Sequence, residues 1–146
     1  MVENPQFVKY WIRPNKKENY NPQDRKLWNT RGVNQMGMGD KIIFYISGKK
    51  YMKFASIASI KGEDPEDGSL ICEYEIQLPE EKWVDRPPKE FLSELDVVKN
   101  NFNLDKGGLG LLVKTTRQIT RNDFLKIEEY IMNKSKKIKA CLSFRK

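Results

Sequence analysis

Two apolar runs joined by a short turn constrain the fold of this chain more than any other feature of its sequence. Residues 41–47, KIIFYIS, form the clearest predicted strand, in which even-numbered and odd-numbered side chains lie on opposite faces. The turn SGKK leads into residues 53–60, KFASIASI, whose alanine and serine side chains suit a tightly curved sheet. The two runs therefore predict a β-hairpin in the wall of a small barrel.

Shorter segments predict additional strands and helices. Strands are expected over 7–13, 70–78 and 111–117. A short helix is expected over 21–27, because its first two residues, asparagine and proline, suit a helix start. A second is expected over 87–95, and a third begins at Thr120, which with Asp123 resembles a capping box. Because strands and helices do not alternate as a parallel sheet requires, the predicted fold class is α+β, a small β-barrel with short peripheral helices.

The chain of 146 residues has the length of a single domain. We expect that domain to span residues 1–133. Residues 134–146 form a basic C-terminal tail, with six basic residues and no acidic one. The composition of this tail allows it either to extend the last helix or to fray.

Charge is unevenly distributed along the body of the chain. Segments 9–31 and 41–61 each carry a net charge of +5, whereas residues 62–105 carry −9. The +7 of the whole chain is weak evidence for a nucleic-acid partner, because a solvated basic tail also produces it. The polarisation within the body is stronger evidence, and it predicts a positive face formed by the N-terminal half.

Histidine is absent, which excludes catalysis through Ser-His-Asp or Cys-His groups and any histidine-bound metal. The two cysteines, Cys72 and Cys141, do not suffice for a zinc cluster. No segment has the roughly 20 apolar residues that span a bilayer, and the N-terminus lacks the profile of a signal peptide. We expect a cytoplasmic monomer with no cofactor, no metal and no membrane partner.

Two other patterns resemble enzyme motifs, and a simpler structural explanation is preferred for each. The glycine-rich run at 106–112 lacks the Gly-Lys-Ser/Thr of a phosphate-binding loop and fits a loop before a strand. The PEEK sequence at 79–82, with Asp64 and Asp67 upstream, resembles the acids and lysine of metal-dependent nucleases. Such a coincidence is expected in a segment as acidic as this one.

The three tryptophans, Trp11, Trp28 and Trp83, are candidates for stacking on a base. Position alone favours core packing over ligand stacking, above all for Trp11, which lies within a predicted strand. Trp28 lies where a predicted helix gives way to a polar loop, a position that does not require burial.

Four segments, taken in order, resemble the EVE family, which is related to PUA and YTH domains. They are YWI at 10–12, GDKIIFYIS at 39–47, FLSELDVVKNN at 91–101 and ITRNDFLKIEEYI at 119–131. The likeness covers nearly the whole chain except the basic tail. It implies a PUA-like barrel and a nucleic-acid-binding module that holds a modified base, in DNA or RNA, in an aromatic pocket.

Similarity to the YTH domain, carried by RPNKKEN at 13–19 and WNT at 28–30, implies a set of binding residues. Asn15 and Asn19 would face the base edge, and Trp28 would stack on the base. The whole expected pocket comprises Asn15, Asn19, Trp28, Asn29, Tyr45, Ser47 and Trp83, the last as its second wall. The basic residues expected to hold phosphates are Arg13, Lys16, Lys17, Arg25, Arg31, Lys49 and Lys50. Turn formation after a proline also explains the two asparagines.

Three functions are therefore weighed. The preferred one is a non-catalytic module that reads a modified base. The second is a PUA-type RNA-binding protein that recognises structured RNA by shape, without selectivity for a modification. The third is a nuclease or glycosylase that acts through carboxylates, and the absence of histidine and the separation of acidic from basic segments count against it.

Overall fold

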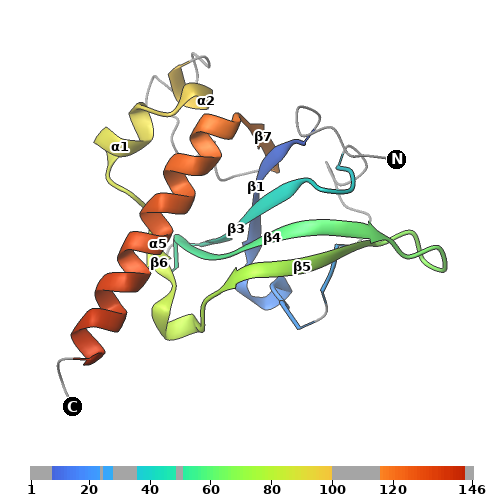
Figure 1. Ribbon diagram of the computed structural model, residues 1–146, viewed down its shortest axis with the longest axis horizontal. Helices are drawn as coiled ribbons and strands as arrows, with labels where there is room; N and C mark the ends of the chain where they lie inside the picture. Colours follow the sequence, from blue (N-terminus) through green and yellow to red (C-terminus); the bar gives the residue numbers. More distant parts are fainter. Residues whose placement is uncertain (1–7, 24, 28–35, 49–50, 100–115, 144–146) are drawn as a thin grey trace.

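The computed structural model describes residues 8–23, 25–27, 36–48, 51–99 and 116–143, with the side chains of 89 and 136–143 excepted. Within these ranges the chain forms a curled sheet crossed at one end by a long helix (Figure 1). This is the α+β class predicted from the sequence, a curled sheet with peripheral helices.

The sheet has seven strands, and the predicted hairpin lies at its centre. The strands are β1 (Tyr10–Lys16), β2 (Lys26–Leu27), β3 (Lys41–Ser47), β4 (Lys53–Glu63), β5 (Leu70–Gln77), β6 (Val84–Asp85) and β7 (Arg117–Ile119). They are ordered β2-β5-β4-β3-β1-β7, and β6 pairs with β4. Only the pairing of β1 with β3 is parallel among the described strands, and it runs from Tyr10↔Lys41 to Lys16↔Ser47.

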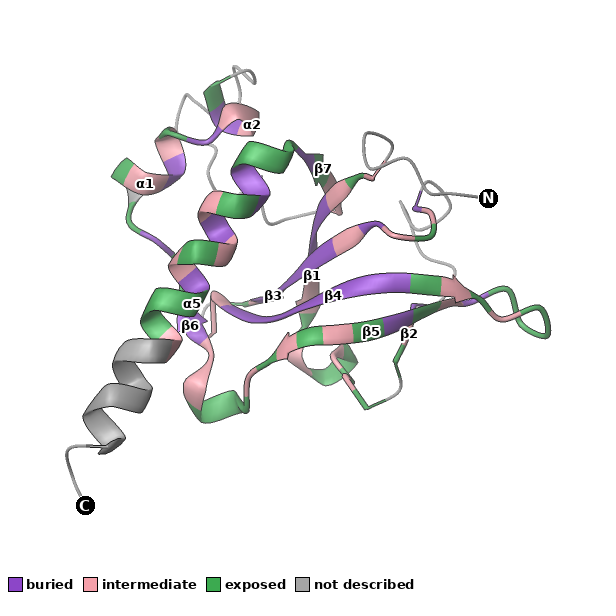
Figure 2. Cartoon of the chain, viewed as in Figure 1, coloured by how far each residue is buried: buried purple, intermediate pink, exposed green. Residues whose placement is uncertain are grey.

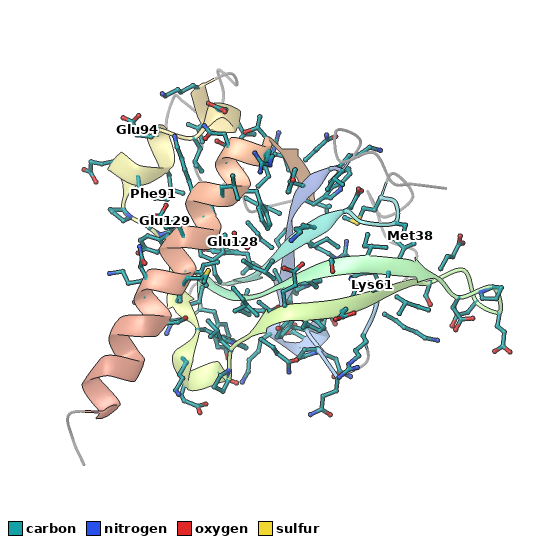
Figure 3. The ribbon with its side chains drawn as sticks, in the orientation of Figure 1. Met38, Lys61, Phe91, Glu94, Glu128 and Glu129 are labelled. Atoms are coloured by element: carbon teal, nitrogen blue, oxygen red, sulfur yellow. The ribbon has the colours of Figure 1, made fainter. Side chains whose placement is uncertain are left out.

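Short helices lie at the edges of the sheet, and one long helix packs on it. They are the 3-10 helices η2 (Lys17–Asn19) and η4 (Glu80–Lys82), and the α-helices α1 (Lys89–Ser93), α2 (Asp96–Lys99) and α5 (Arg121–Ser143). Phe91 of α1, labelled in Figure 3, contacts α5, where its ring centroid lies 5.2 Å from that of Tyr130. The basic tail extends the last helix as far as Ser143.

Both faces of the central strands are buried, as Figure 2 shows for β3 and β4. On one face, Phe124, Ile127 and Ile131 of α5 pack in a core with side chains of β1, β3 and β4. The opposite face holds a second core around Trp11, Phe44 and residues of β4 and β5. Burial on both faces explains why these strands are almost continuously apolar.

Two buried carboxylates accept hydrogen bonds from backbone amides. Asp40, 2% exposed, accepts from the amides of Lys9 and Gly37 and from the indole Nε1 of Trp11, at 2.9–3.1 Å. Asp123 accepts from the amides of Asp96 and the following residue and so caps the start of α2. The amide of Asp123 in turn donates to Thr120 Oγ1, which is half of the predicted capping box.

The predicted helix over 21–27 is wrong. Pro22 lies in a turn, and Lys26 and Leu27 form β2, an edge strand on β5. Leu27 is buried in the second core opposite Leu70, so tertiary packing outweighs the local helix-start signal. The strand predicted over 7–13 begins at Tyr10. Of the strand predicted over 111–117, Arg117 lies in β7, and residues 111–115 lie outside the described residues.

Replacing Asp40 by asparagine is expected to lower the free energy of unfolding by about 2–3 kcal/mol, because a charged acceptor becomes an amide that faces a donor. Urea denaturation checks this. Asp85→Asn, an exposed carboxylate, is the matched control and should change stability by less than about 0.5 kcal/mol. A loss at Asp40 no larger than at Asp85 would show that the buried carboxylate is dispensable.

Candidate functional site

Three aromatic side chains from separate segments meet at the end of the sheet where β1 and β3 finish. The rings of Tyr20 and Trp83 lie 5.8 Å apart at 78°, and those of Tyr51 and Trp83 lie 6.3 Å apart at 69°. We call Tyr20, Tyr51 and Trp83 the aromatic rim. Lys17 and Glu80 border it, since the Lys17 Nζ contacts both Glu80 and the Tyr51 ring.

The turn between β3 and β4 positions Tyr51. Gly48 has φ +110°, a conformation that glycine adopts without strain, and its carbonyl accepts from the Tyr51 amide at 3.0 Å. Met52 follows with φ +51° and returns the chain to β4. The sequence SGKKYM thus presents a tyrosine at the rim.

The 3-10 helix η4 positions Trp83. Pro79 precedes the helix, and its carbonyl accepts from the Lys82 amide at 2.8 Å. The Trp83 amide donates to Glu80 O, and the indole Nε1 donates to Leu78 O at 3.1 Å. Because the indole N–H is satisfied within its own turn, the half-buried ring is held in one orientation.

Tyr20 connects the rim to the second core. Its hydroxyl and Ser56 Oγ form a 2.7 Å hydrogen bond, and its ring lies 6.1 Å from that of Phe44. Burial raises the pKa of the Tyr20 hydroxyl, which the hydrogen bond to Ser56 opposes. Burial therefore favours the protonated hydroxyl, which is able to donate a hydrogen bond.

An open depression of about 460 Å³ lies against the rim. It is lined by Tyr51, Lys53, Glu80, Glu81 and Trp83. The lining combines two aromatic rings with two carboxylates and one ammonium. Such a surface suits a flat or cationic group better than a phosphate.

Lys17 is held over this surface. Its Nζ lies 3.1 Å from Glu80 Oε1 and 5.5 Å from the centroid of the Tyr51 ring. The hydrogen bond to Glu80, followed by the charge of that carboxylate and by Tyr51, raises the pKa of Lys17. The ammonium is therefore fully charged where it meets the ring.

Of the predicted pocket residues, four lie at or beside this end of the sheet. Ser47 Oγ donates to Asn15 O at 3.3 Å at the ends of β3 and β1, Asn19 is exposed in η2, and Trp83 is part of the rim. Trp28 and Asn29 lie outside the described residues.

The prediction that Tyr45 lines the pocket is wrong. Tyr45 is 1% exposed, its ring lies 5.3 Å from that of Phe54, and both belong to the core that α5 covers. The alternation predicted for β3 is correct, but the face that carries Tyr45 is the one that packs against the helix.

Leu27, which precedes Trp28, lies far from the rim. It pairs with Leu70 at the start of β5, whereas Gln77 at the end of β5 pairs with Ser56. Seven residues of strand separate the two ends, a distance of about 24 Å. Among the described residues, Trp83 is thus the tryptophan that the sheet brings to the same end as Asn15.

The residues predicted to bind phosphates also differ in their surroundings. Arg13 is buried, and its guanidinium donates to Thr116 Oγ1, so the prediction of a phosphate contact at Arg13 is wrong. The Lys17 ammonium pairs with Glu80. Lys16 and Arg25 are exposed. Arg31, Lys49 and Lys50 lie outside the described residues.

Charge polarisation along the sequence is reduced in the folded chain. Five lysines of the two basic segments pair with carboxylates of the acidic segment 62–105. They are Lys17, Lys26, Lys41, Lys53 and Lys61. Adjacent strands β4 and β5 carry opposite charges, so the fold places the two kinds of segment side by side.

Sequence reasoning missed Tyr20, Tyr51 and Glu80. Tyr51 follows directly on a Gly-Lys-Lys turn, and an aromatic residue next to a predicted turn was the available signal. Tyr20 gave no such signal, and Glu80 stood out only as part of the PEEK sequence at 79–82, because their roles depend on contacts across the fold.

The described residues lack both a metal-binding cluster and a reactive thiol. The described residues contain no group of three histidine, cysteine or acidic side chains placed to hold a metal ion. Burial raises the pKa of the Cys72 thiol to about 11, which keeps it protonated and unreactive at neutral pH. No helix within the described ranges is long and apolar enough to span a bilayer.

Comparison with solved structures shows a shared fold. Protein Atu2648 from Agrobacterium tumefaciens has a TM-score of 0.52 and 16% identity, over 85% of this chain and 93% of that one. A hypothetical protein from Leishmania major has a TM-score of 0.57 and 12% identity, over 89% and 98%. Human THYN1 in complex with DNA containing 5-methylcytosine has a TM-score of 0.49 and 13% identity, over 87% and 98%, a similarity too low to bear on function.

No protein-family model matches the chain, and no functionally curated protein matches it. The solved structures therefore establish the fold, and the EVE resemblance is a hypothesis that rests on the four sequence segments.

Tyr20→Phe is expected to destabilise the protein by about 1–2 kcal/mol, because it leaves Ser56 Oγ buried without its partner. Ser56→Ala should cost a similar amount, and the double variant should cost less than the sum of the two. Urea denaturation of the three variants measures this coupling. Strict additivity would contradict a direct bond between the two hydroxyls.

Proposed function

We propose that this chain is a non-catalytic nucleic-acid-binding module that holds one base of a single strand, or one flipped from a duplex, against the aromatic rim. The observation that carries the proposal is the convergence of Tyr20, Tyr51 and Trp83 beside an open depression. Aromatic faces provide stacking platforms for any base, and each stacked base contributes about 1–3 kcal/mol.

Polar groups that suit a base edge lie at the same end of the sheet. Asn19 is exposed in η2, and an asparagine amide both donates and accepts, as the Watson–Crick edge of a base requires. Asn15 and Ser47 lie at the adjoining strand ends. In this proposal they read the edge of a base that the rim stacks.

Selectivity for a modified base is part of the proposal and follows from the EVE resemblance. A methyl group on the stacked base adds apolar area against the aromatic side chains. In this proposal the site binds the base without catalysing a reaction on it.

Trp83→Ala should weaken binding to single-stranded oligonucleotides by about 1–3 kcal/mol through loss of stacking. Fluorescence anisotropy with two oligonucleotides that differ by one base methyl group measures affinity and selectivity together. Asn19→Ala should reduce the discrimination between the two oligonucleotides more than the affinity for the unmethylated one, because it removes edge contacts.

Two control measurements distinguish the loss of stacking at the aromatic rim from a loss of folding and from stacking on Trp28. Thermal melting of Trp83→Ala shows whether the variant stays folded. Trp28→Ala tests the stacking role implied by the YTH likeness. A folded Trp83→Ala protein that binds every oligonucleotide like the wild type would contradict the proposal, and equal affinity for the methylated and plain oligonucleotides would favour a general RNA-binding protein.

Phosphate contacts are expected from the exposed basic residues Lys16 and Arg25. Replacing either by alanine should weaken binding to all sequences alike and reduce the slope of log K against log salt by ~0.7–0.9. Lys41→Ala is a matched control, because Lys41 pairs with Glu75. Unchanged salt slopes for Lys16 and Arg25 would place the phosphate contacts elsewhere.

A further inference from the structure

The depression beside the aromatic rim combines features that a neutral base does not require. Two carboxylates, Glu80 and Glu81, line it together with Tyr51 and Trp83. Carboxylates repel the phosphates of a nucleic acid, so their presence at the mouth of a base site opposes binding unless the ligand brings a positive charge to meet them.

The protein itself shows that a cation fits this surface. The ammonium of Lys17 lies over the Tyr51 ring, 5.5 Å from its centroid, and 3.1 Å from a Glu80 oxygen. A cation over an aromatic ring and beside a carboxylate gains from both the ring quadrupole and the opposite charge. Lys17 belongs to η2, an exposed single turn, and its side chain is 40% exposed.

Glu81 gives the site a second negative charge. It lines the depression, is exposed, and forms no ion pair with any residue in the described part of the chain. Lys17 neutralises Glu80, and the charge of Lys53 is neutralised by Asp85. A cationic ligand would therefore meet one unneutralised carboxylate and could exchange with Lys17 at the other.

We propose that the rim selects a base made cationic by methylation over neutral bases. This inference rests on the proposed function, because it assigns the class of ligand to the same site. A methylated heterocycle spreads its charge over a flat ring and is less strongly hydrated than the ammonium of a lysine. It therefore loses less hydration on leaving water for the aromatic surface, and it stacks as a neutral base does.

1-Methyladenine and N6-methyladenine are isomers as neutral bases, and each carries one methyl group. At neutral pH 1-methyladenine is protonated and positively charged, whereas N6-methyladenine is neutral. Fluorescence anisotropy at pH 7 measures the affinity for single-stranded oligonucleotides that carry one base or the other. We expect about tenfold tighter binding to the cationic isomer, which is the affinity gain that one partly desolvated cation–π contact provides.

Three variants test the source of this ratio. Glu80→Gln/Glu81→Gln should bring the ratio close to one, whatever its effect on overall affinity. Lys17→Ala should raise the ratio, because it removes the competing ammonium. Glu66→Gln, the same change in the turn between β4 and β5 at the opposite end of β5, is the control and should leave the ratio unchanged.

The outcomes distinguish this inference from the function on which it rests. Equal binding of both isomers by the wild type, with both weakened by Trp83→Ala, would overturn the inference and support the base site. A ratio that persists in Glu80→Gln/Glu81→Gln would also overturn it, because the cation would then be recognised elsewhere. Absence of binding to either isomer, with no effect of Trp83→Ala, would overturn both proposals.

Discussion

Asp40 joins three strands at one end of the sheet through its carboxylate and its backbone carbonyl, and the remaining architecture depends on this junction. One oxygen accepts from the Lys9 amide before β1, and the other accepts from the Trp11 indole and the Gly37 amide. Its backbone carbonyl accepts from Ile60 of β4. A charged group buried to this extent is stable only because donors surround it, so the three strands must meet in one arrangement.

That arrangement fixes what happens at the opposite end of the sheet. β1 and β3 are parallel, so the register set beside Asp40 persists over seven residues and ends with Lys16 beside Ser47. η2 and the β3–β4 turn follow directly and bring Lys17 and Tyr51 together. A slip of one residue would reverse the faces of β1 and separate these groups. The candidate site thus depends on a buried hydrogen-bond network that it does not touch.

Local patterns in the sequence predicted the central hairpin, the alternation within β3, the α+β class and the last helix, because each rests on nearby residues. Predictions failed where distant contacts decide. Leu27 becomes a strand residue through Leu70, and Tyr45 is buried because α5 packs on its face of β3. Distant contacts also limited the prediction of the site. The sequence identified Trp83, Asn15 and Asn19, but it did not reveal the pairing of Lys17 with Glu80, which lie 63 positions apart.

The tryptophan indole N–H resonances offer the most direct test of the account. In a nitrogen-15 correlation spectrum, Trp11, whose indole is bonded to Asp40, and Trp83, whose indole is bonded to Leu78, report on opposite ends of the sheet. Assignment follows from replacing each tryptophan by phenylalanine. On titration with a single-stranded oligonucleotide, the account predicts that the Trp83 resonance shifts while that of Trp11 stays in place. Shifts at Trp11 with none at Trp83 would contradict the assignment of the site to the aromatic rim.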